Sequence, residues 1–215
     1  MKMENAYPIF VKLQGRKCLV IGGGQVAFRK AETLLQYGAQ VDVIACEIAE
    51  EMRALADRGR INLSVRAYED GDEEGHSIVF AATGDPSVNR RIAENCHARG
   101  IWLNAVDDPE HCDFYVPAQL RRGDVTVAVS TFGKSPVLAA QIKERIAEVI
   151  TGEYGVLADL LGEIREEVNG SGKSTEEKKA FYQELMAKDP LRMIRCKETQ
   201  QVREMFRSCL SCWLE

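Results

Sequence analysis

The sequence lacks any hydrophobic run long enough to cross a membrane. Its longest apolar runs, such as residues 18–21, are far shorter than the roughly 20 residues that a membrane helix needs. Residues 1–5 contain none of the apolar core of a secretory signal. We therefore expect a cytoplasmic protein without a membrane partner.

An excess of positive charge is also missing. The 28 Lys and Arg residues are outnumbered by 33 Asp and Glu residues, which gives a net charge of -5. This balance argues against a general nucleic-acid binder, although it leaves room for a local basic pocket. With 45% hydrophobic and 28% charged residues, the chain has the composition of an ordinary globular protein rather than a disordered one.

A disulfide framework is the third absence. The seven cysteines are odd in number, and their spacing matches no such framework, so we expect reduced thiols. Cys209 and Cys212 have the spacing of half a zinc site, with Cys196 upstream. The second half of such a site is missing, and free thiols are the simpler interpretation.

The first half of the chain alternates short apolar runs with helical patterns. The expected strands are residues 17–21, 41–45, 62–66, 77–83 and 101–106, and the expected helices are residues 25–37, 47–58 and 85–99. Residues 70–75 are expected to form a solvated loop. Strands separated by helices of this length predict an α/β fold with a Rossmann-like, doubly wound parallel sheet.

The pattern changes after this region. Two extended runs, at 114–117 and 125–130, and a helix that begins at Ser135 predict a small α+β segment. An all-helical tail follows, with a linker at 169–172. Its apolar stripe needs a partner surface because we expect the tail to have little core of its own. This surface would belong to the first part of the chain or to a second copy, and we favour the second copy.

The strongest motif is a glycine-rich turn between the first expected strand and helix. Gly22, Gly24 and Ala27 fit the pattern G-x-G-x-x-A. In this pattern the first glycine permits a tight turn and the second lets the backbone approach a pyrophosphate. The helix N-terminus that follows favours anions. A structural glycine turn is the alternative, but the strand–turn–helix context favours dinucleotide binding.

The residue that would bind the ribose hydroxyls is expected about 20 positions further on. Glu47 lies 23 residues after Gly24, and no arginine follows the second expected strand before Arg53. A 2′-phosphate therefore lacks an evident partner, and we expect NAD rather than NADP. The remaining cofactor contacts are expected from Gln25, Val26, Cys46 and Thr83.

These segments together resemble precorrin-2 dehydrogenase, which also forms the dehydrogenase and ferrochelatase part of siroheme synthase. The resemblance covers about residues 7–150 closely and rests on motifs that begin at Pro8, Gly22, Arg29, Ala81, Asn104 and Ser135. It implies NAD-dependent oxidation of precorrin-2 to sirohydrochlorin on a homodimer. Some members also insert Fe²⁺ to give siroheme. The chain is too short to hold the additional methyltransferase domain of trifunctional siroheme synthase.

The resemblance divides the chain and assigns its site residues. It implies an NAD-binding domain at 1–113, a dimerisation segment at 114–151 and a helical domain at 152–215. Asp107 would be the catalytic residue, as a proton acceptor and a metal ligand, with His111 as a further metal candidate. A turn-capping role for Asp107 or Asp108 is the alternative.

The octacarboxylate substrate calls for cations. Arg29 and Lys30 lie close to the glycine turn, and Lys134 and Ser135 lie in a loop that resembles the substrate loop of the family. A rival interpretation is a non-catalytic NAD-sensing module, although such modules carry an acidic residue right at the end of the second strand. A chelatase without dehydrogenase activity is a third, which the intact glycine motif disfavours.

Overall fold

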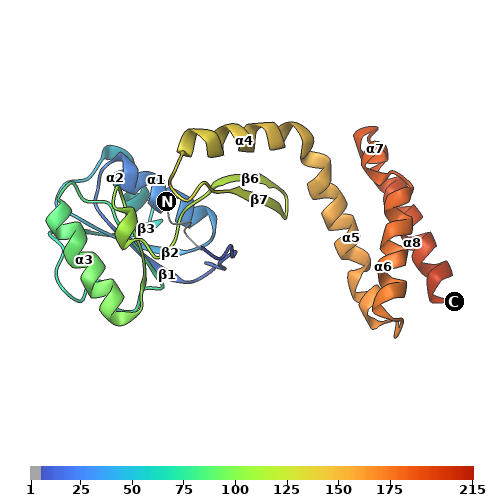
Figure 1. Ribbon diagram of the computed structural model, residues 1–215, viewed down its shortest axis with the longest axis horizontal. Coiled ribbons are helices and arrows are strands. Elements are labelled where there is room, and N and C mark those ends of the chain that lie inside the picture. Colours follow the sequence, from blue (N-terminus) through green and yellow to red (C-terminus); the bar gives the residue numbers. More distant parts are fainter. Residues whose placement is uncertain (1–5) are drawn as a thin grey trace. The chain divides into compact units, whose positions relative to one another are not determined.

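The computed structural model describes residues 6–215, so the interpretation of residues 1–5 lies outside the described part. The chain forms two compact units, Met1–Val116 and Pro117–Glu215 (Figure 1). No helix in the described range is long and apolar enough to cross a membrane.

A five-stranded parallel sheet forms the centre of the first unit. Its strands are β1 (Lys17–Ile21), β2 (Gln40–Ala45), β3 (Ile61–Val65), β4 (Ile78–Ala81) and β5 (Trp102–Ala105). They lie in the order β3-β2-β1-β4-β5, so the chain reverses direction across the sheet between β3 and β4. This arrangement confirms the Rossmann-like fold. It brings the carboxyl ends of β1 and β4 together, where such sheets bind ligands.

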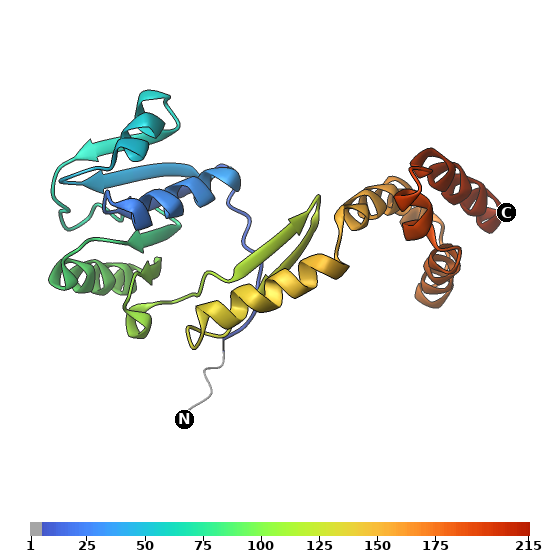
Figure 2. The same cartoon turned by 90° about the horizontal axis from the view of Figure 1, so that it is seen from above.

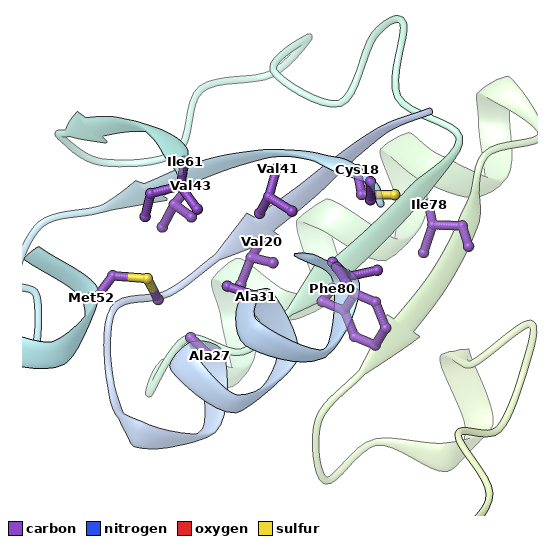
Figure 3. Packing of buried hydrophobic residues seen from close by; sticks show 12 residues of the cluster. Cys18, Val20, Ala27, Ala31, Val41, Val43, Met52, Ile61, Ile78 and Phe80 are labelled. Carbon is purple, nitrogen blue, oxygen red and sulfur yellow. The ribbon is translucent and has the colours of Figure 1, made fainter. Parts of the chain in front are cut away.

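Helices cover both faces of this sheet because each buried strand is apolar on both sides. One face packs against α1 (Gln25–Gln36) and α2 (Glu50–Asp57). Figure 3 shows Val20 and Phe80 on this face, turned toward Ala27 and Ala31 of α1. The other face packs against α3 (Pro86–Arg99). The helix expected at 47–58 corresponds to α2, which starts three residues later than expected.

The loop expected to be solvated at 70–75 contains a buried carboxylate. The side chain of Glu73 is fully buried. It accepts a hydrogen bond from the Tyr68 hydroxyl at 2.7 Å, and Arg99 forms an ion pair with it at 3.2 Å. The expectation was wrong for this residue. Tyr68 and Arg99 lie outside the loop, and their contacts compensate the cost of burying the charge of Glu73.

The second unit begins with a β-hairpin of β6 (Ala118–Arg122) and β7 (Val125–Val129), which packs against α4 (Pro136–Val149), as Figure 2 shows. The strand expected at 114–117 was placed too early. The Phe114 carbonyl instead accepts a hydrogen bond from the Asn104 side chain at 3.0 Å. The Phe114 ring meets that of Phe80 edge-on at 5.6 Å. These contacts belong to the first unit.

Four helices complete the second unit: α5 (Gly152–Gly170), α6 (Thr175–Ala187), α7 (Pro190–Arg195) and α8 (Thr199–Leu214). The expectation of a tail with little core was wrong, because its apolar stripes pack against one another. The buried residues are Leu157, Leu160, Ile164, Val168, Phe181, Leu185, Ile194, Val202, Phe206 and Leu210. The linker expected at 169–172 is also shorter, since α5 extends to Gly170. Ser174 and Glu177 form a capping box at the start of α6.

Candidate functional site

The glycine turn joins β1 to α1, and its three glycines have different surroundings. Gly22 has a φ of 128°, and a Cβ there would lie 2.2 Å from the Ala82 carbonyl oxygen. A Cβ on Gly23 would lie 2.0 Å from the Glu47 carbonyl oxygen. A Cβ on Gly24 would point into open space. Gly22 and Gly23 are therefore required by packing, whereas Gly24 leaves room for a ligand beside the backbone.

The N-terminus of α1 begins at this open position. Gly24 is the N-cap residue, and no side chain caps the helix. The first backbone N–H groups of a helix have no partner within the helix, so they are available to an anion. Gln25 and Val26 are exposed in this first turn. The turn thus combines an uncapped helix N-terminus with an open approach, which is the arrangement that suits a pyrophosphate.

The loop after β2 lies directly against the turn. The backbone N–H of Ala49 donates to the Gly23 carbonyl at 2.8 Å, and that of Gly22 donates to the Ile44 carbonyl at 2.9 Å. Cys46 and Glu47 are both exposed in this loop. The close contact at Gly23, for which the sequence analysis had assigned no role, holds Glu47 beside the turn.

Thr83 follows β4 and is held by a buried asparagine. Its hydroxyl donates to the Asn89 Oδ1 at 2.7 Å, and the Asn89 Nδ2 returns a hydrogen bond to the Thr83 carbonyl at 3.2 Å. Sequence reasoning missed Asn89, which is only 7% exposed. The available signal was a polar residue in the apolar stripe that Ile92 and Cys96 continue along α3.

Asp107 lies just beyond β5, and its surroundings differ from those of its neighbour. It is exposed and has a φ of 62°, in the left-handed region, which aspartate tolerates better than most residues. Asp108 instead pairs with the ring of His111 at 2.8 Å, across the short helix η1 (Pro109–His111). Among the described residues Asp107 has no hydrogen-bond partner, so its carboxylate faces solvent and is available to a substrate.

The structure does not assemble a metal centre from these groups. Within residues 6–215, no three His, Cys, Asp or Glu side chains come together in a way that could hold a metal ion. All seven cysteines are free thiols, Cys196, Cys209 and Cys212 among them. Metal binding by Asp107 or His111 stays a prediction.

The residues expected to bind the substrate lie in both units. Arg29 and Lys30 lie on α1, in the same unit as the glycine turn. Lys134 and Ser135 lie in the second unit, ahead of α4. The Ser135 hydroxyl accepts a hydrogen bond from the Leu138 N–H at 3.2 Å and so caps α4.

Two family models match the chain. A family described as "Putative NAD(P)-binding" matches residues 9–118, and one described as "Sirohaem biosynthesis protein central" matches residues 122–148. Their boundary falls close to the division between the two compact units. The first match covers the glycine turn and Asp107, and the second covers β7 and most of α4.

Curated relatives and a solved structure are also similar. A siroheme synthase of Methylococcus capsulatus is 42% identical over 83% of this chain and 38% of its own length. One of Acinetobacter baylyi is 35% identical over 84% of this chain and 40% of its length. The chain thus spans about two fifths of these relatives. The structure of SirC, a precorrin-2 dehydrogenase, is 24% identical, covers 94% of this chain and 100% of its own, and has a TM-score of 0.76, which supports the fold.

Proposed function

Because this chain belongs to the NAD(P)-binding family that includes precorrin-2 dehydrogenase and the corresponding part of siroheme synthase, we propose that it oxidises precorrin-2 to sirohydrochlorin with NAD. One observation carries the proposal. An open glycine turn follows β1, and an aspartate without a hydrogen-bond partner in residues 6–215 follows β5 at the same edge of the parallel sheet. Ligands of such sheets bind beyond the carboxyl ends of the strands.

The oxidation removes two hydrogens from precorrin-2, one as a hydride and one as a proton. NAD supplies the hydride acceptor when it is bound. The N-terminus of α1 would hold the pyrophosphate, and Gly24 would keep its approach open. Asp107 would accept the proton, since its exposed carboxylate has no competing partner among the described residues.

We assign NAD rather than NADP because of the loop after β2. Glu47 is exposed and held next to the turn, where a carboxylate favours ribose hydroxyls and repels a 2′-phosphate. Cys46 and Thr83 would border the same cofactor. Affinities for NAD and NADP, measured by calorimetry, test this assignment, and tighter NADP binding would contradict it.

Insertion of Fe²⁺ into sirohydrochlorin is a second activity that the family relationship supports. Asp107 would take up pyrrole protons as the metal enters, with His111 as a second group. Seven free thiols support a reducing, cytoplasmic compartment for both steps.

One assay separates these activities. The protein is supplied with precorrin-2 and NAD, with or without Fe²⁺, and sirohydrochlorin and siroheme are followed separately by absorbance. NAD-dependent formation of sirohydrochlorin is expected. If NAD binds but no sirohydrochlorin forms, the chain is an NAD-sensing module instead. Siroheme formed from supplied sirohydrochlorin, without dehydrogenation, would make it a chelatase only.

We further propose that the chain is a homodimer joined through α4. Four apolar side chains of this helix are exposed, namely Val137, Leu138, Ile142 and Val149. A row of this kind is typical of an interface. The tail has its own core and so does not require a partner. Sedimentation should give twice the 24.0 kDa of one chain at micromolar concentration.

A charged variant tests the dimer interface. Leu138→Asp should dissociate the dimer, because an unpaired carboxylate would be buried there. Leu214 is similarly exposed on α8, and Leu214→Asp is the matched control that should remain dimeric. A wild-type monomer, or a dimeric Leu138→Asp, would contradict the proposal.

A further inference from the structure

The first unit contains a cavity of about 230 Å³ along one flank of α1. Its first lining residue, Val26, lies two residues after Gly24 along the helix. The lining residues are Val26, Arg29, Lys30, Thr33, Leu34, Phe80 and Val116. Apolar side chains form most of its wall, and two cations are its only charged residues.

These two cations lie close together without a compensating carboxylate. The Lys30 ammonium lies 5.4 Å from the centroid of the Phe80 ring, whose side chain Figure 3 shows facing α1. Burial, and to a smaller extent the charge of Arg29, lowers the pKa of Lys30. Within residues 6–215 neither cation forms an ion pair. The cavity therefore contains two positive charges, and a bound anion would reduce the repulsion between them.

The polar groups of the cavity also limit which kind of ligand could bind there. The Thr33 hydroxyl donates to the Arg29 carbonyl at 2.8 Å, so its proton is already used within the helix. The only side-chain donors left for an anion are those of Arg29 and Lys30. An anionic tip on a short apolar stalk matches this arrangement, because the stalk can contact Leu34, Phe80 and Val116.

We propose that this cavity binds one acetate or propionate arm of the tetrapyrrole, with its carboxylate between Arg29 and Lys30. The identity of the substrate rests on the proposed function. The position suits an anchor for a bound ring. Val26 adjoins the cofactor turn, and the Phe80 ring of the cavity wall meets that of Phe114, which follows the Asp107 loop. An arm held here would anchor the macrocycle between these two parts of the site.

Steady-state kinetics of charge-removing variants test the proposal. Lys30→Met and Arg29→Met keep most of the apolar stalk of each side chain. Each should raise the KM for precorrin-2 by about 10- to 100-fold, as expected for a lost charge-assisted hydrogen bond. The KM for NAD should stay unchanged. Arg60 is exposed in the turn before β3, so Arg60→Met is the matched control and should alter neither value.

A second measurement does not depend on turnover. Side-chain NMR of Lys30 follows its titration as propionate is added to about 100 mM, because a single arm is expected to bind weakly. Propionate should raise the pKa of Lys30 in the wild type, and Arg29→Met should reduce the effect. Circular dichroism checks that each variant is folded.

The outcomes separate the two proposals. If the wild type oxidises precorrin-2, an unchanged KM in both variants overturns the cavity assignment and leaves the proposed function intact. If the wild type is inactive, a propionate effect at Lys30 supports a carboxylate cavity although the proposed function has failed. Absence of both turnover and the propionate effect overturns both.

Discussion

The backbone of Gly22 lies so close to that of Ala82 that a Cβ on the glycine would be 2.2 Å from the alanine carbonyl oxygen. The two segments are also hydrogen-bonded next to this contact, since the Ala82 N–H donates to the Ile21 carbonyl at 2.8 Å. Because of this contact, the turn after β1 packs directly against the end of β4. It thereby determines how far the N-terminus of α1 lies from Thr83.

Substitutions at two glycines of this turn should therefore have different effects. Gly22→Ala should destabilise the first unit, because a left-handed φ costs an L-residue roughly 1–2 kcal/mol and the Ala82 carbonyl must also move. Gly24→Val should fold normally, since its Cβ meets no atom within 4 Å. It should nevertheless weaken NAD binding by occupying the approach to the helix N-terminus.

Urea unfolding and calorimetric NAD titration distinguish the two effects. The assigned site is wrong if a folded Gly24→Val protein binds NAD as tightly as the wild type. Equal stability of Gly22→Ala and the wild type would contradict the packing argument.

Periodicity and turn residues were enough to predict the sheet and its helices. The glycine turn depends on local chemistry. The ends of α3 do too, since the helix follows the N-cap Asp85 and stops at Gly100, which has a φ of 66°. The Asp85 side chain accepts the Ser87 N–H at 2.8 Å, as an N-cap should. Local signals of this kind are readable because the partners are neighbours in the sequence.

The features that sequence reasoning missed depend on contacts between different elements of the fold. Glu73 is buried because Tyr68 and Arg99 reach it, and Asn89 is buried because Thr83 does. The closeness of Gly23 to Glu47 depends on how two loops pack. Only the tertiary structure reveals these partners, although the apolar stripe of α3 signals that Asn89 is buried.

Thiol reactivity should follow burial. Cys46, Cys196 and Cys212 are exposed, whereas Cys18 and Cys96 are buried. Burial raises the pKa of Cys18 to about 11, so its reactive thiolate is scarce at neutral pH. In the native protein a thiol reagent should label the three exposed cysteines first, and peptide mass spectrometry identifies them. Rapid labelling of Cys18 before denaturation would contradict the packing of β1.

The helical core of the second unit should be sensitive to truncation. Phe206 is 1% exposed and belongs to the cluster that joins α5 to α8. Phe206→Ala should lower the free energy of unfolding by about 3–5 kcal/mol through lost burial and a residual cavity. Leu214→Ala, at a side chain 41% exposed, is the control and should change it little. A small effect at Phe206 in urea unfolding would show that the tail lacks this core.

The two aspartates after β5 should differ in their effect on catalysis. Among the residues that the structure describes, Asp107 has no hydrogen-bond partner, whereas Asp108 is paired with His111 at 2.8 Å. Asp107→Asn is the sharper substitution, because asparagine also tolerates a φ of 62° and an alanine there would add backbone strain. It should leave folding and NAD affinity intact, since the residue lies outside the glycine turn.

Asp107→Asn should lower kcat for sirohydrochlorin formation by about 10²–10⁴-fold, the usual range for a lost general base. Asp108→Asn removes the charge that faces His111 but leaves the proton acceptor at 107 in place, so its effect should be much smaller. If one carboxylate serves both steps, Asp107→Asn also impairs Fe²⁺ insertion. Loss of dehydrogenation with insertion preserved would mean that the steps use different groups, and His111 would be tested next. Wild-type kcat in Asp107→Asn would remove Asp107 from the mechanism.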